Sequence, residues 1–305
     1  MSALAKDSDK AAKKLKDQLA KLAAAQQNRP EPDTYLADLR LALTLADQAD
    51  QITLDRFRAK DLDVSGKEDD TPVTDADRDT ETLLRDQIGR TRPDDTVLGE
   101  EFGSVGSSQL TKLALDGERV WVVDPIDGTA NYVRGLPVWA TLIGLVADGR
   151  VALGVVSAPA LGQRWFAAAG YGAWKGLGMD AAEPLAVSKI KRLGDAFLSL
   201  SDLSGWEDQG RLAGLLRLIE DSQRCRGFGD FWSYMVVAEG AVDIAAEPDL
   251  APHDMVALAS IVTEAGGQFT DTRGKVTGPF GSDALATNGK LHHRVLPYLH
   301  TKNGK

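Results

Sequence analysis

The stretch "VWVVDPIDGTANYV", residues 120–133, ends an apolar run on two carboxylates, Asp124 and Asp127. Residues 120–123 are all apolar and predict a strand that is buried on both faces. Such a strand would position the two acids rigidly, and the turn after it would aim them. An Asp-Pro pair followed by Gly is also ordinary turn chemistry, so this stretch alone leaves a purely structural interpretation open.

Further acids stand where other strands or helices are expected to end, and too few Lys or Arg residues lie near them in the sequence to pair with every one. Carboxylates gathered in a cleft repel one another and stay ionised only where cations neutralise them. Oxygen ligands without a set of Cys or His ligands point to Mg²⁺ or Mn²⁺. These acids are Asp75, Asp77 and Asp79 in "PVTDADRD", Glu100 and Glu101 in "LGEEFG", and Asp254 in "APHDMVAL".

Two close divalent ions can clamp a phosphate ester, lower the pKa of a bound water and stabilise the leaving oxygen. Asp124, at the strand end, is placed to bridge two such ions, with the Ile126 carbonyl and Asp127 on opposite sides of the turn. Gly128 and Thr129 begin a predicted short helix whose free N–H groups would face a phosphate. The hypothesis is therefore a metal-dependent phosphate-ester site.

The elements that position these acids can be predicted from periodicity. A helix capped by Asp33 or Thr34 runs to about residue 59, residues 63–72 form a polar loop, and Thr74 caps a second helix. A short strand at 96–99 precedes the 120–123 strand, and two more strands meet in a hairpin at Asp148–Gly149.

Helices and strands alternate in the C-terminal part of the chain. The expected strands are 196–201, 242–247 and 284–288, and the expected helices are 207–221, 230–240, 253–265 and a closing helix that carries His292, His293 and His300 on a solvated surface. The pattern predicts an antiparallel-rich α+β half, residues 33–185, followed by an α/β half, residues 186–300, without a flexible linker.

Residues 1–32 stand apart because they are rich in Ala and Lys. Leu15, Leu19 and Leu22 share one helical face, and Pro30 and Pro32 end the pattern. A solvated helical tail and a partner-binding helix both fit this segment.

Composition excludes several classes of function. The formal net charge of −10 makes a general nucleic-acid-binding surface unlikely, and Cys225, the only cysteine among 305 residues, rules out a disulfide framework. No apolar run long enough to span a membrane and no secretory signal are found, so we expect a soluble, cytoplasmic protein. An EF-hand is disfavoured because Thr80 stands where the loop needs Gly, and Walker, G-x-S-x-G and H-E-x-x-H motifs are absent.

Three motifs together resemble the inositol monophosphatase-type, Mg²⁺-dependent, lithium-sensitive phosphatases: "GEE" at 99–101, "WVVDPIDGTANYVRGLP" at 121–137 and "HDMVALASIVTEAGG" at 253–267. The resemblance covers residues 34–300 and implies a layered α-β-α-β-α sandwich, commonly a homodimer. Within this superfamily, "GEEFG", "GDFWSYMVVAEGAVDIAAEP" and "ALATNG" are most similar to the bacterial histidinol-phosphatases of this fold.

The resemblance also implies roles for individual residues. Glu100, Asp124, the Ile126 carbonyl, Asp127 and Asp254 would hold two Mg²⁺ ions (Mn²⁺ being an alternative), and Asp77 would help with a third, weaker one. Glu100 and Thr129 would orient the attacking water, with Asp77 beside them, and the amides of Gly128 and Thr129 would hold the phosphate. No covalent enzyme intermediate would form.

Three residues further along the chain match the organic end of the substrate: Gly229, Asp230 and Glu247. Two acids there would favour a substrate whose organic part is cationic, such as histidinol phosphate, over one whose organic part is neutral, such as inositol phosphate. For Asp230, a helix-capping role is the alternative. His253 stands where the family usually has Trp, and it either fills the same space or touches the substrate or a metal-bound water.

The expected activity is hydrolysis of the small phosphorylated substrate L-histidinol phosphate in histidine biosynthesis. An inositol-1-phosphate or broad sugar phosphatase is the alternative enzyme. A regulatory protein that uses the same fold to bind other macromolecules, through the basic N-terminal helix, is the alternative of another class.

Overall fold

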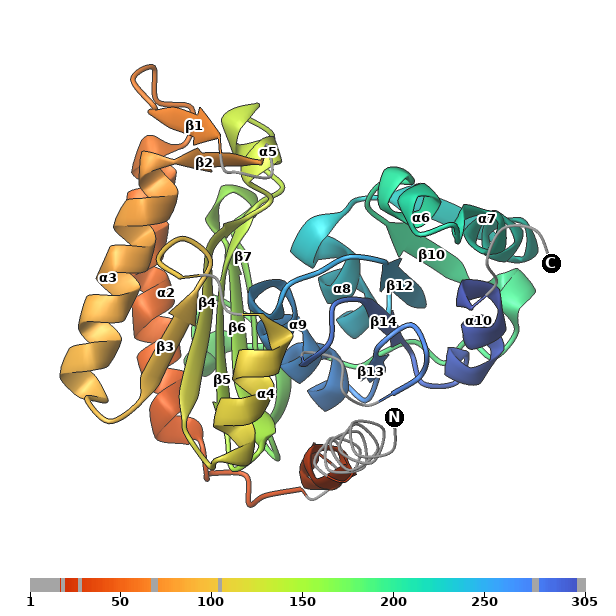
Figure 1. Cartoon of the computed structure of the whole chain (residues 1–305), viewed down its shortest axis with the longest axis horizontal. Helices are drawn as coiled ribbons and strands as arrows, with labels where there is room; N and C mark the ends of the chain where they lie inside the picture. Colours follow the sequence, from red (N-terminus) through yellow and green to blue (C-terminus); the bar gives the residue numbers. More distant parts are fainter. Residues whose placement is uncertain are drawn as a thin grey trace, which may run out of the picture.

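The computed structural model describes residues 17, 20–26, 29–66, 71–103, 106–275 and 280–300. Over these residues the chain builds five layers, in the order helices, large sheet, helices, small sheet, helices (Figure 1). This arrangement confirms the α-β-α-β-α sandwich expected from the sequence. None of the described helices combines the length and apolar character that a membrane span requires.

The large sheet of the described chain has seven strands, of which β3 and β4 are parallel and the remaining neighbours antiparallel. Other layers cover both faces of the central strands of this sheet. These strands are therefore apolar along their length and do not alternate strictly between apolar and polar residues. In sheet order the strands are β3 (Thr96–Gly99), β4 (Val120–Asp127), β5 (Ala140–Ala147), β6 (Arg150–Ala158), β7 (Gln163–Ala168), β8 (Gly172–Lys175) and β9 (Glu183–Pro184).

The small sheet has five strands in the described chain, with β11, β10 and β12 parallel and the other pairs antiparallel. In sheet order they are β11 (Arg224–Gly227), β10 (Phe197–Leu200), β12 (Ile244–Glu247), β14 (Ala284–Thr287) and β13 (Gln268–Thr270). Short 3₁₀ turns at Pro159–Leu161, Met179–Ala181 and Leu193–Asp195 lie between strands.

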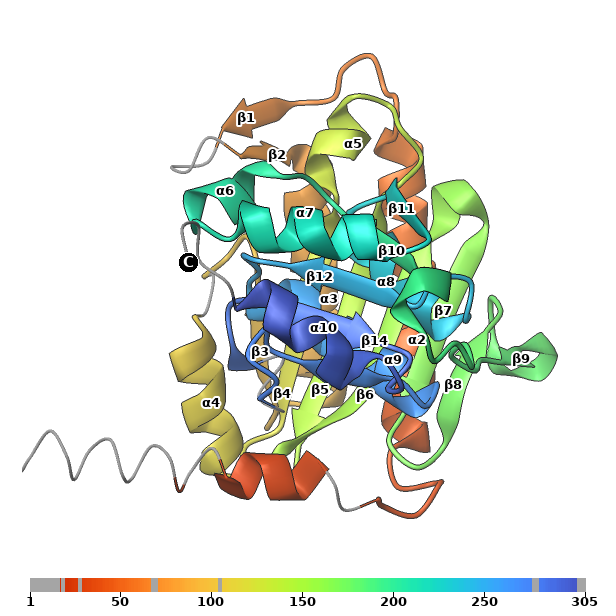
Figure 2. The ribbon, with the colours of Figure 1, turned by 90° about the vertical axis from the view of Figure 1, so that its right-hand side faces the viewer.

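Three groups of helices complete the layers. Helices α2 (Leu36–Arg56) and α3 (Asp75–Thr91) cover the outer face of the large sheet, and α8 (Asp230–Ala238) and α9 (Pro252–Glu264) fill the space between the sheets. Figure 2 shows α7 (Leu212–Asp221) and α10 (His292–Leu299) on the outer face of the small sheet, near α6 (Ser204–Asp208). Helix α4 (Ser107–Leu115) packs beside β4, and the short helix α5 (Thr129–Val133) follows β4 in the chain.

Helix α9 lies directly on a pair of glycines in the large sheet. Gly144 of β5 and Gly154 of β6 face each other in the register. A Cβ atom added to Gly144 would lie 2.5 Å from Val256 Cγ1, and one added to Gly154 would lie 2.3 Å from the Ala257 carbonyl oxygen. The close approach of α9 to the sheet therefore requires glycine at both positions.

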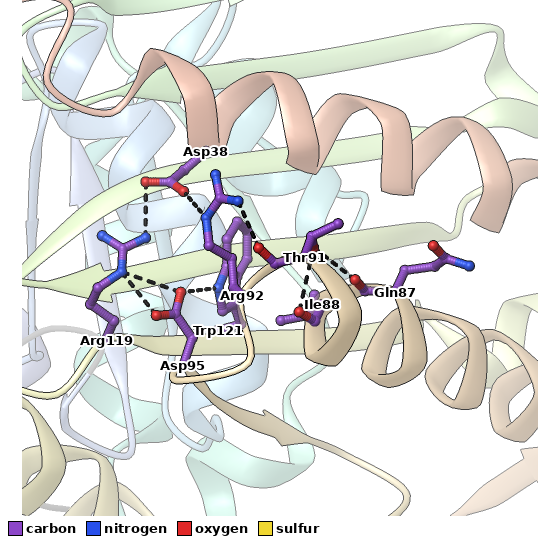
Figure 3. A network of polar contacts seen from close by, with 8 residues as sticks. All are labelled: Asp38, Gln87, Ile88, Thr91, Arg92, Asp95, Arg119 and Trp121. Carbon is purple, nitrogen blue, oxygen red and sulfur yellow. Dashed lines mark hydrogen bonds and ion pairs between the residues drawn. The ribbon is translucent and has the colours of Figure 1, made fainter.

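A network of acids and arginines joins the ends of α2, α3, β3 and β4 (Figure 3). Asp38 accepts hydrogen bonds from Arg92 Nε and Arg119 Nη2, both at 2.9 Å. Asp95, just before β3, accepts them from Arg119 Nε at 3.0 Å and from Trp121 Nε1 at 2.8 Å. These bonds fix where β3 and β4 begin.

Two local predictions were wrong. Part of the expected polar loop forms two antiparallel strands, β1 (Val64–Gly66) and β2 (Pro72–Thr74). The residues of β1 are exposed, so this strand needs no apolar pattern that the sequence could show. Residues 67–70 lie outside the described chain. The helix expected over 207–221 is divided into α6 and α7 because Gly210 has a φ of 66°, a left-handed conformation that ends a helix.

The N-terminal segment is not simply solvated. Residues 20–26 are helical, and Leu22 is buried against Leu110, Val120 and other apolar residues of α4 and the large sheet. The backbone N–H of Val151 donates to Gln26 Oε1 at 3.2 Å, and Arg29 forms an ion pair with Glu264 at 3.3 Å. Leu15 and Leu19 lie outside the described residues.

Candidate active site

Two adjoining cavities, of about 600 and about 480 Å³, lie where β4 ends and α8 and α9 begin. Their shared walls include Asp127, Asp230 and Asp254, so the two spaces communicate. Among the described residues lining either cavity there are several acids but no Lys and no Arg. A third cavity, beside Arg29, has one carboxylate, Glu264, which Arg29 already pairs.

The first cavity gathers two groups of side chains that could hold a metal ion. Ligand atoms of Glu100, Asp124 and His253 lie within 4.8 Å of one another, and so do those of Asp124, Asp127 and Asp254. Asp124 belongs to both groups, and its Oδ1 atom is buried without a hydrogen-bond partner in the described chain. Carboxylate-rich groups with an unpaired buried oxygen fit hard divalent cations.

An irregularity in β4 gives Asp124 and Asp127 their positions. The register with β5 shifts between these two residues, and Thr141 Oγ1 donates to the Pro125 carbonyl at 2.8 Å within the shift. The backbone N–H of Phe231, in the first turn of α8, donates to Asp127 Oδ2 at 2.6 Å. The strand, its interruption and α8 therefore hold both acids at the cavity.

Asp254 comes from a different layer. It stands in the first turn of α9, where its Oδ2 accepts a hydrogen bond from the Ala251 N–H at 2.7 Å. Its Oδ1 lies 3.4 Å from His253 Nε2. His253 thus lies in the wall of the first cavity, beside the carboxylates.

The acids raise one another's pKa. Burial, followed by the charges of Glu100, Asp127 and Asp254, raises the pKa of Asp124 well above its usual range. Burial and then the neighbouring Asp230 and Asp254 do the same for the pKa of Asp127. A cation between them would relieve both the lost solvation and the repulsion, which is the electrostatic signature expected of a metal site.

Thr129 links the cavity to Asp77. Its Oγ1 lies 2.9 Å from the Ile126 carbonyl oxygen and 3.4 Å from Asp77 Oδ1. Asp77 is buried, and its Oδ2 accepts hydrogen bonds from the N–H and the hydroxyl of Thr74 at the start of α3. Burial raises the pKa of Asp77 to about 7, against the lowering effect of the Thr74 bonds.

Asp230 does not cap α8. Gly229 is the N-cap residue, and no side-chain cap is present. Asp230 has a φ of 49°, unusual for a residue with a side chain, and its Oδ2 accepts a hydrogen bond from Asn131 Nδ2 at 2.8 Å. Burial raises the pKa of Asp230 to about 6. Gly128, next to the Asp230 Oδ2 atom, has a φ of 87°, and a Cβ atom there would lie 3.0 Å from the Val138 carbonyl oxygen, so the position favours glycine.

The second cavity forms an acidic end of the site. Glu247, at the end of β12, is buried there, and burial and then Asp230 and Asp254 raise its pKa well above the usual range. One Glu247 oxygen and the Tyr234 hydroxyl are buried without hydrogen-bond partners in the described chain. Among the residues of this wall, sequence reasoning missed Asp202, Asp208, Tyr234 and Asp249.

The structure brings most of the predicted site residues to the two cavities. Gly229 and Asp77 do not line them; Asp77 is reached through Thr129, and Gly229 precedes Asp230. The first cavity is lined by Glu100, Asp124, Ile126, Asp127, Gly128, Thr129, Asp230 and Asp254, and the second includes Glu247.

The histidines of the last helix were partly misplaced by the sequence analysis. His293 and His300 are exposed, but His292 is fully buried. Its ring nitrogens lie 2.9 Å from Thr270 Oγ1 and 3.0 Å from Thr287 Oγ1. His292 is therefore buried between α10 and the small sheet, and it lines neither of the two cavities.

Comparison with known proteins identifies a family and several relatives of this chain. Residues 37–303 match the inositol monophosphatase family. The chain is 52% identical to the histidinol-phosphatase of Streptomyces coelicolor over 275 residues, which cover 89% of this chain and 99% of that protein. It is 53% identical to the histidinol-phosphatase of Mycobacterium tuberculosis over 264 residues, covering 86% of this chain and 97% of that protein.

Solved structures show the same fold at lower identity. The extragenic suppressor protein SuhB of Bartonella henselae superposes with a TM-score of 0.76 at 26% identity, over 87% of this chain and 99% of that one. An inositol monophosphatase from Zymomonas mobilis superposes with a TM-score of 0.74 at 28% identity, over 88% of this chain and 99% of that one.

Proposed function

Because the chain belongs to the inositol monophosphatase family, we propose that it hydrolyses L-histidinol phosphate to L-histidinol and phosphate, as a step of histidine biosynthesis. The observation that carries this proposal is a cavity in which Asp124 serves two groups of metal-binding side chains, next to a second cavity rich in acids. Two relatives of 52% and 53% identity are histidinol-phosphatases, which supports this substrate.

Glu100, Asp124, the Ile126 carbonyl, Asp127 and Asp254 would hold two Mg²⁺ ions, and Asp77 would assist a third; Mn²⁺ is the alternative metal. When bound, the ions would polarise the phosphate, acidify a water and neutralise the leaving oxygen. His253 adds an imidazole next to Glu100 and Asp124, close enough to touch a metal ion or its water.

Glu100 and Thr129 would orient the water that attacks phosphorus opposite the leaving alcohol. The short distances from Thr129 Oγ1 to the Ile126 carbonyl and Asp77 restrict its rotation, which favours one orientation of that water. The backbone amides of Gly128 and Thr129, at the wall of the first cavity, would hold the phosphate. The attack needs no covalent enzyme intermediate, and the leaving alkoxide takes its proton from water.

The second cavity would receive the organic part of the substrate. Histidinol carries an ammonium group and a basic imidazole, and both would be attracted by Glu247, Asp230 and the further acids Asp202 and Asp208. Gly229 would shape the backbone beside Asp230. A neutral polyol would gain no such attraction, because it could not compensate the buried carboxylates.

Two further properties follow from the family resemblance and belong to this proposal: inhibition by lithium and a homodimer in solution. A cytoplasmic location, expected from the sequence, belongs to it as well. We also propose that residues 33–185 and 186–300 are two halves of one unit and not independent domains, because α8 and α9 share one apolar core with both sheets.

The test is a substrate panel. Phosphate release is measured from histidinol phosphate, inositol 1-phosphate and fructose 1,6-bisphosphate at equal Mg²⁺, with and without lithium. The expected result is a kcat/KM for histidinol phosphate at least about 100-fold above the others, which matches the loss of one charge-assisted contact of about 3 kcal/mol. Equal or faster turnover of inositol phosphate would favour the alternative, a broad-specificity phosphatase.

A further inference from the structure

Glu81 is a buried acid of α3 that faces the loop carrying Glu100. Its side chain is fully buried, yet no role in the chemistry above requires it. Its Oε2 accepts a hydrogen bond from the Glu101 N–H at 2.6 Å, and its Oε1 accepts one from the Phe102 N–H at 3.2 Å. The two amides that follow Glu100 therefore share one carboxylate.

Arg85, one helical turn further along α3, also binds this loop. Arg85 Nε donates to Glu81 Oε1 at 2.7 Å, so the buried charge is paired. The other guanidinium nitrogens donate to the carbonyl oxygens of Val97 at 3.0 Å and Phe102 at 3.2 Å. Together the two side chains hold the backbone both before and after Glu100.

Gly99 has its place in the same contact. A Cβ atom at this position would lie 2.2 Å from Glu81 Oε1 and 2.3 Å from Glu81 Cδ. The carboxylate could not move aside without giving up the amides of Glu101 and Phe102 or the guanidinium of Arg85. The absence of a side chain at residue 99 thus lets Glu81 reach the loop.

We propose that Glu81 is a positioning residue for Glu100: by binding the amides of Glu101 and Phe102, it holds the loop so that the Glu100 carboxylate meets Asp124 in the first cavity. The proposal rests on the metal-binding role of Glu100 given above. Glu81 touches neither substrate nor metal in this scheme. It acts through the backbone, which is stiff because four hydrogen bonds from two side chains converge on residues 97–102.

The main experiment measures binding of Mg²⁺ alone, by calorimetry, to the full chain and to Glu81→Gln. The amide side chain keeps the size of Glu81 but loses the charge that the loop amides and Arg85 bind. Removing a group that supports a metal ligand typically weakens metal binding 10- to 100-fold, so a Kd at least about tenfold higher is expected.

Asp95→Asn is the matched control. The Asp95 carboxylate is also largely shielded, at 5% side-chain exposure, and it also binds an arginine and an N–H donor; it stands just before β3, at the end opposite to Gly99. This variant is expected to lose stability while its Mg²⁺ affinity stays within about twofold of the unsubstituted chain. A weakening as large as that of Glu81→Gln would overturn the proposal, because it would reflect general destabilisation.

Two further variants keep the test decisive if Glu81→Gln does not fold. Arg85→Lys keeps the charge at a partly exposed position but cannot bind Glu81 and both carbonyls at once, so Mg²⁺ affinity should fall by a smaller factor. Gly99→Ala should resemble Glu81→Gln, and combining the two should add little. Unchanged Mg²⁺ affinity in a folded Glu81→Gln, or in Arg85→Lys, would refute the role of Glu81. Absence of Mg²⁺ binding by the unsubstituted chain would instead refute the proposed function.

Discussion

Asp124 shows how one residue can set the chemistry of the site. It belongs to both groups of potential ligands, one including Glu100 and the other including Asp254, and burial raises its pKa well above the usual range. A cation would keep it ionised there. A strand end can hold an acid in such a place only because the backbone around it is fixed by β5. The two groups meet at this carboxylate and at no other described residue.

Asp124→Asn should therefore lose nearly all turnover. The amide removes a negative charge from both ligand groups at once, and a loss of several kcal/mol of transition-state stabilisation corresponds to roughly a 10³-fold lower kcat/KM. Phosphate release from histidinol phosphate measures it, with the circular dichroism spectrum as the control for folding. Activity within tenfold of the unsubstituted chain would contradict the shared role of Asp124.

Glu247→Gln tests the organic end of the site. The variant should lower kcat/KM for histidinol phosphate by about 10- to 100-fold, because a charge-assisted hydrogen bond contributes about 1.5–3 kcal/mol. Turnover of inositol 1-phosphate should change by less than about threefold, since it offers no cation to the carboxylate. Equal losses on both esters would show that Glu247 supports the site in general.

Individual residues show which parts of the site could be predicted from the sequence. The acids at the C-terminal end of β4 and at the start of α9 could be identified because their positions depend on local sequence. Asn131 could not, because its hydrogen bond to Asp230 joins residues 99 positions apart, and neither could Tyr234, which reads as one more apolar residue of α8. Asp202 stands two residues after the end of strand β10, and that signal could have found it.

At the scale of elements, the leucine pattern of the N-terminal segment predicted a helix but could not predict what the helix contacts. Leu22 packs on α4 and the large sheet because those surfaces leave an apolar space there. In the same way, the closing helix α10 was expected, but the burial of His292 depends on the hydroxyls of Thr270 and Thr287, which the chain brings in from β13 and β14.

Deletion of residues 1–32 should lower stability without lowering turnover. The docked helix buries Leu22, and burying such a side chain contributes about 1.5–3 kcal/mol. Denaturant unfolding and phosphate release check the two parts, and Leu22→Ala serves as the milder variant. A lost cellular function with intact phosphatase activity would instead favour the regulatory alternative.

The contact between β14 and α10 through His292 predicts that the stability of the fold depends on pH. Burial, with His293 as a second cause, lowers the pKa of His292 to about 4 from its usual 6.5. Below pH 6.5 the unfolded chain is protonated at His292, whereas the folded chain is not until the pH nears 4. The free energy of unfolding therefore falls as the pH drops from 6.5 to 4. The loss is at most about 3 kcal/mol.

His292→Gln isolates that contribution. The variant should be less stable at pH 7.5, because the Thr270 and Thr287 hydroxyls lose a fitted partner. The difference in unfolding free energy between the unsubstituted chain and the variant should shrink from pH 6.5 to pH 4. Denaturant titrations at several pH values measure it, and a constant difference would refute the pKa shift.

At the scale of the whole molecule, the proposed ligands join layers that the chain forms separately. Glu100, Asp124 and Asp127 belong to the large sheet and its loops, whereas His253 and Asp254 begin the helix between the two sheets. Without cations, the acids of this junction repel one another, so the junction is the part of the molecule in which bound metal should matter most for stability.

Mg²⁺ at 100 times its Kd should therefore raise the unfolding free energy by about 2.7 kcal/mol. Scanning calorimetry with Mg²⁺, compared with KCl at the same ionic strength, measures the effect. In Asp124→Asn the stabilisation at the same Mg²⁺ concentration should be much smaller. Equal stabilisation by KCl would mean that the acids respond to ionic strength alone.

The glycine pair under α9 has a consequence for how this site can change. Gly144 and Gly154 supply no ligand and line neither cavity, yet their missing side chains set the depth at which the helix bearing Asp254 rests on the sheet. A single methyl group at residue 154 would push against the helix backbone and carry Asp254 away from Asp124. The spacing of the proposed metal-binding oxygens is thus encoded partly by empty volume, and the proposed activity could be tuned, or lost, from positions that line neither cavity.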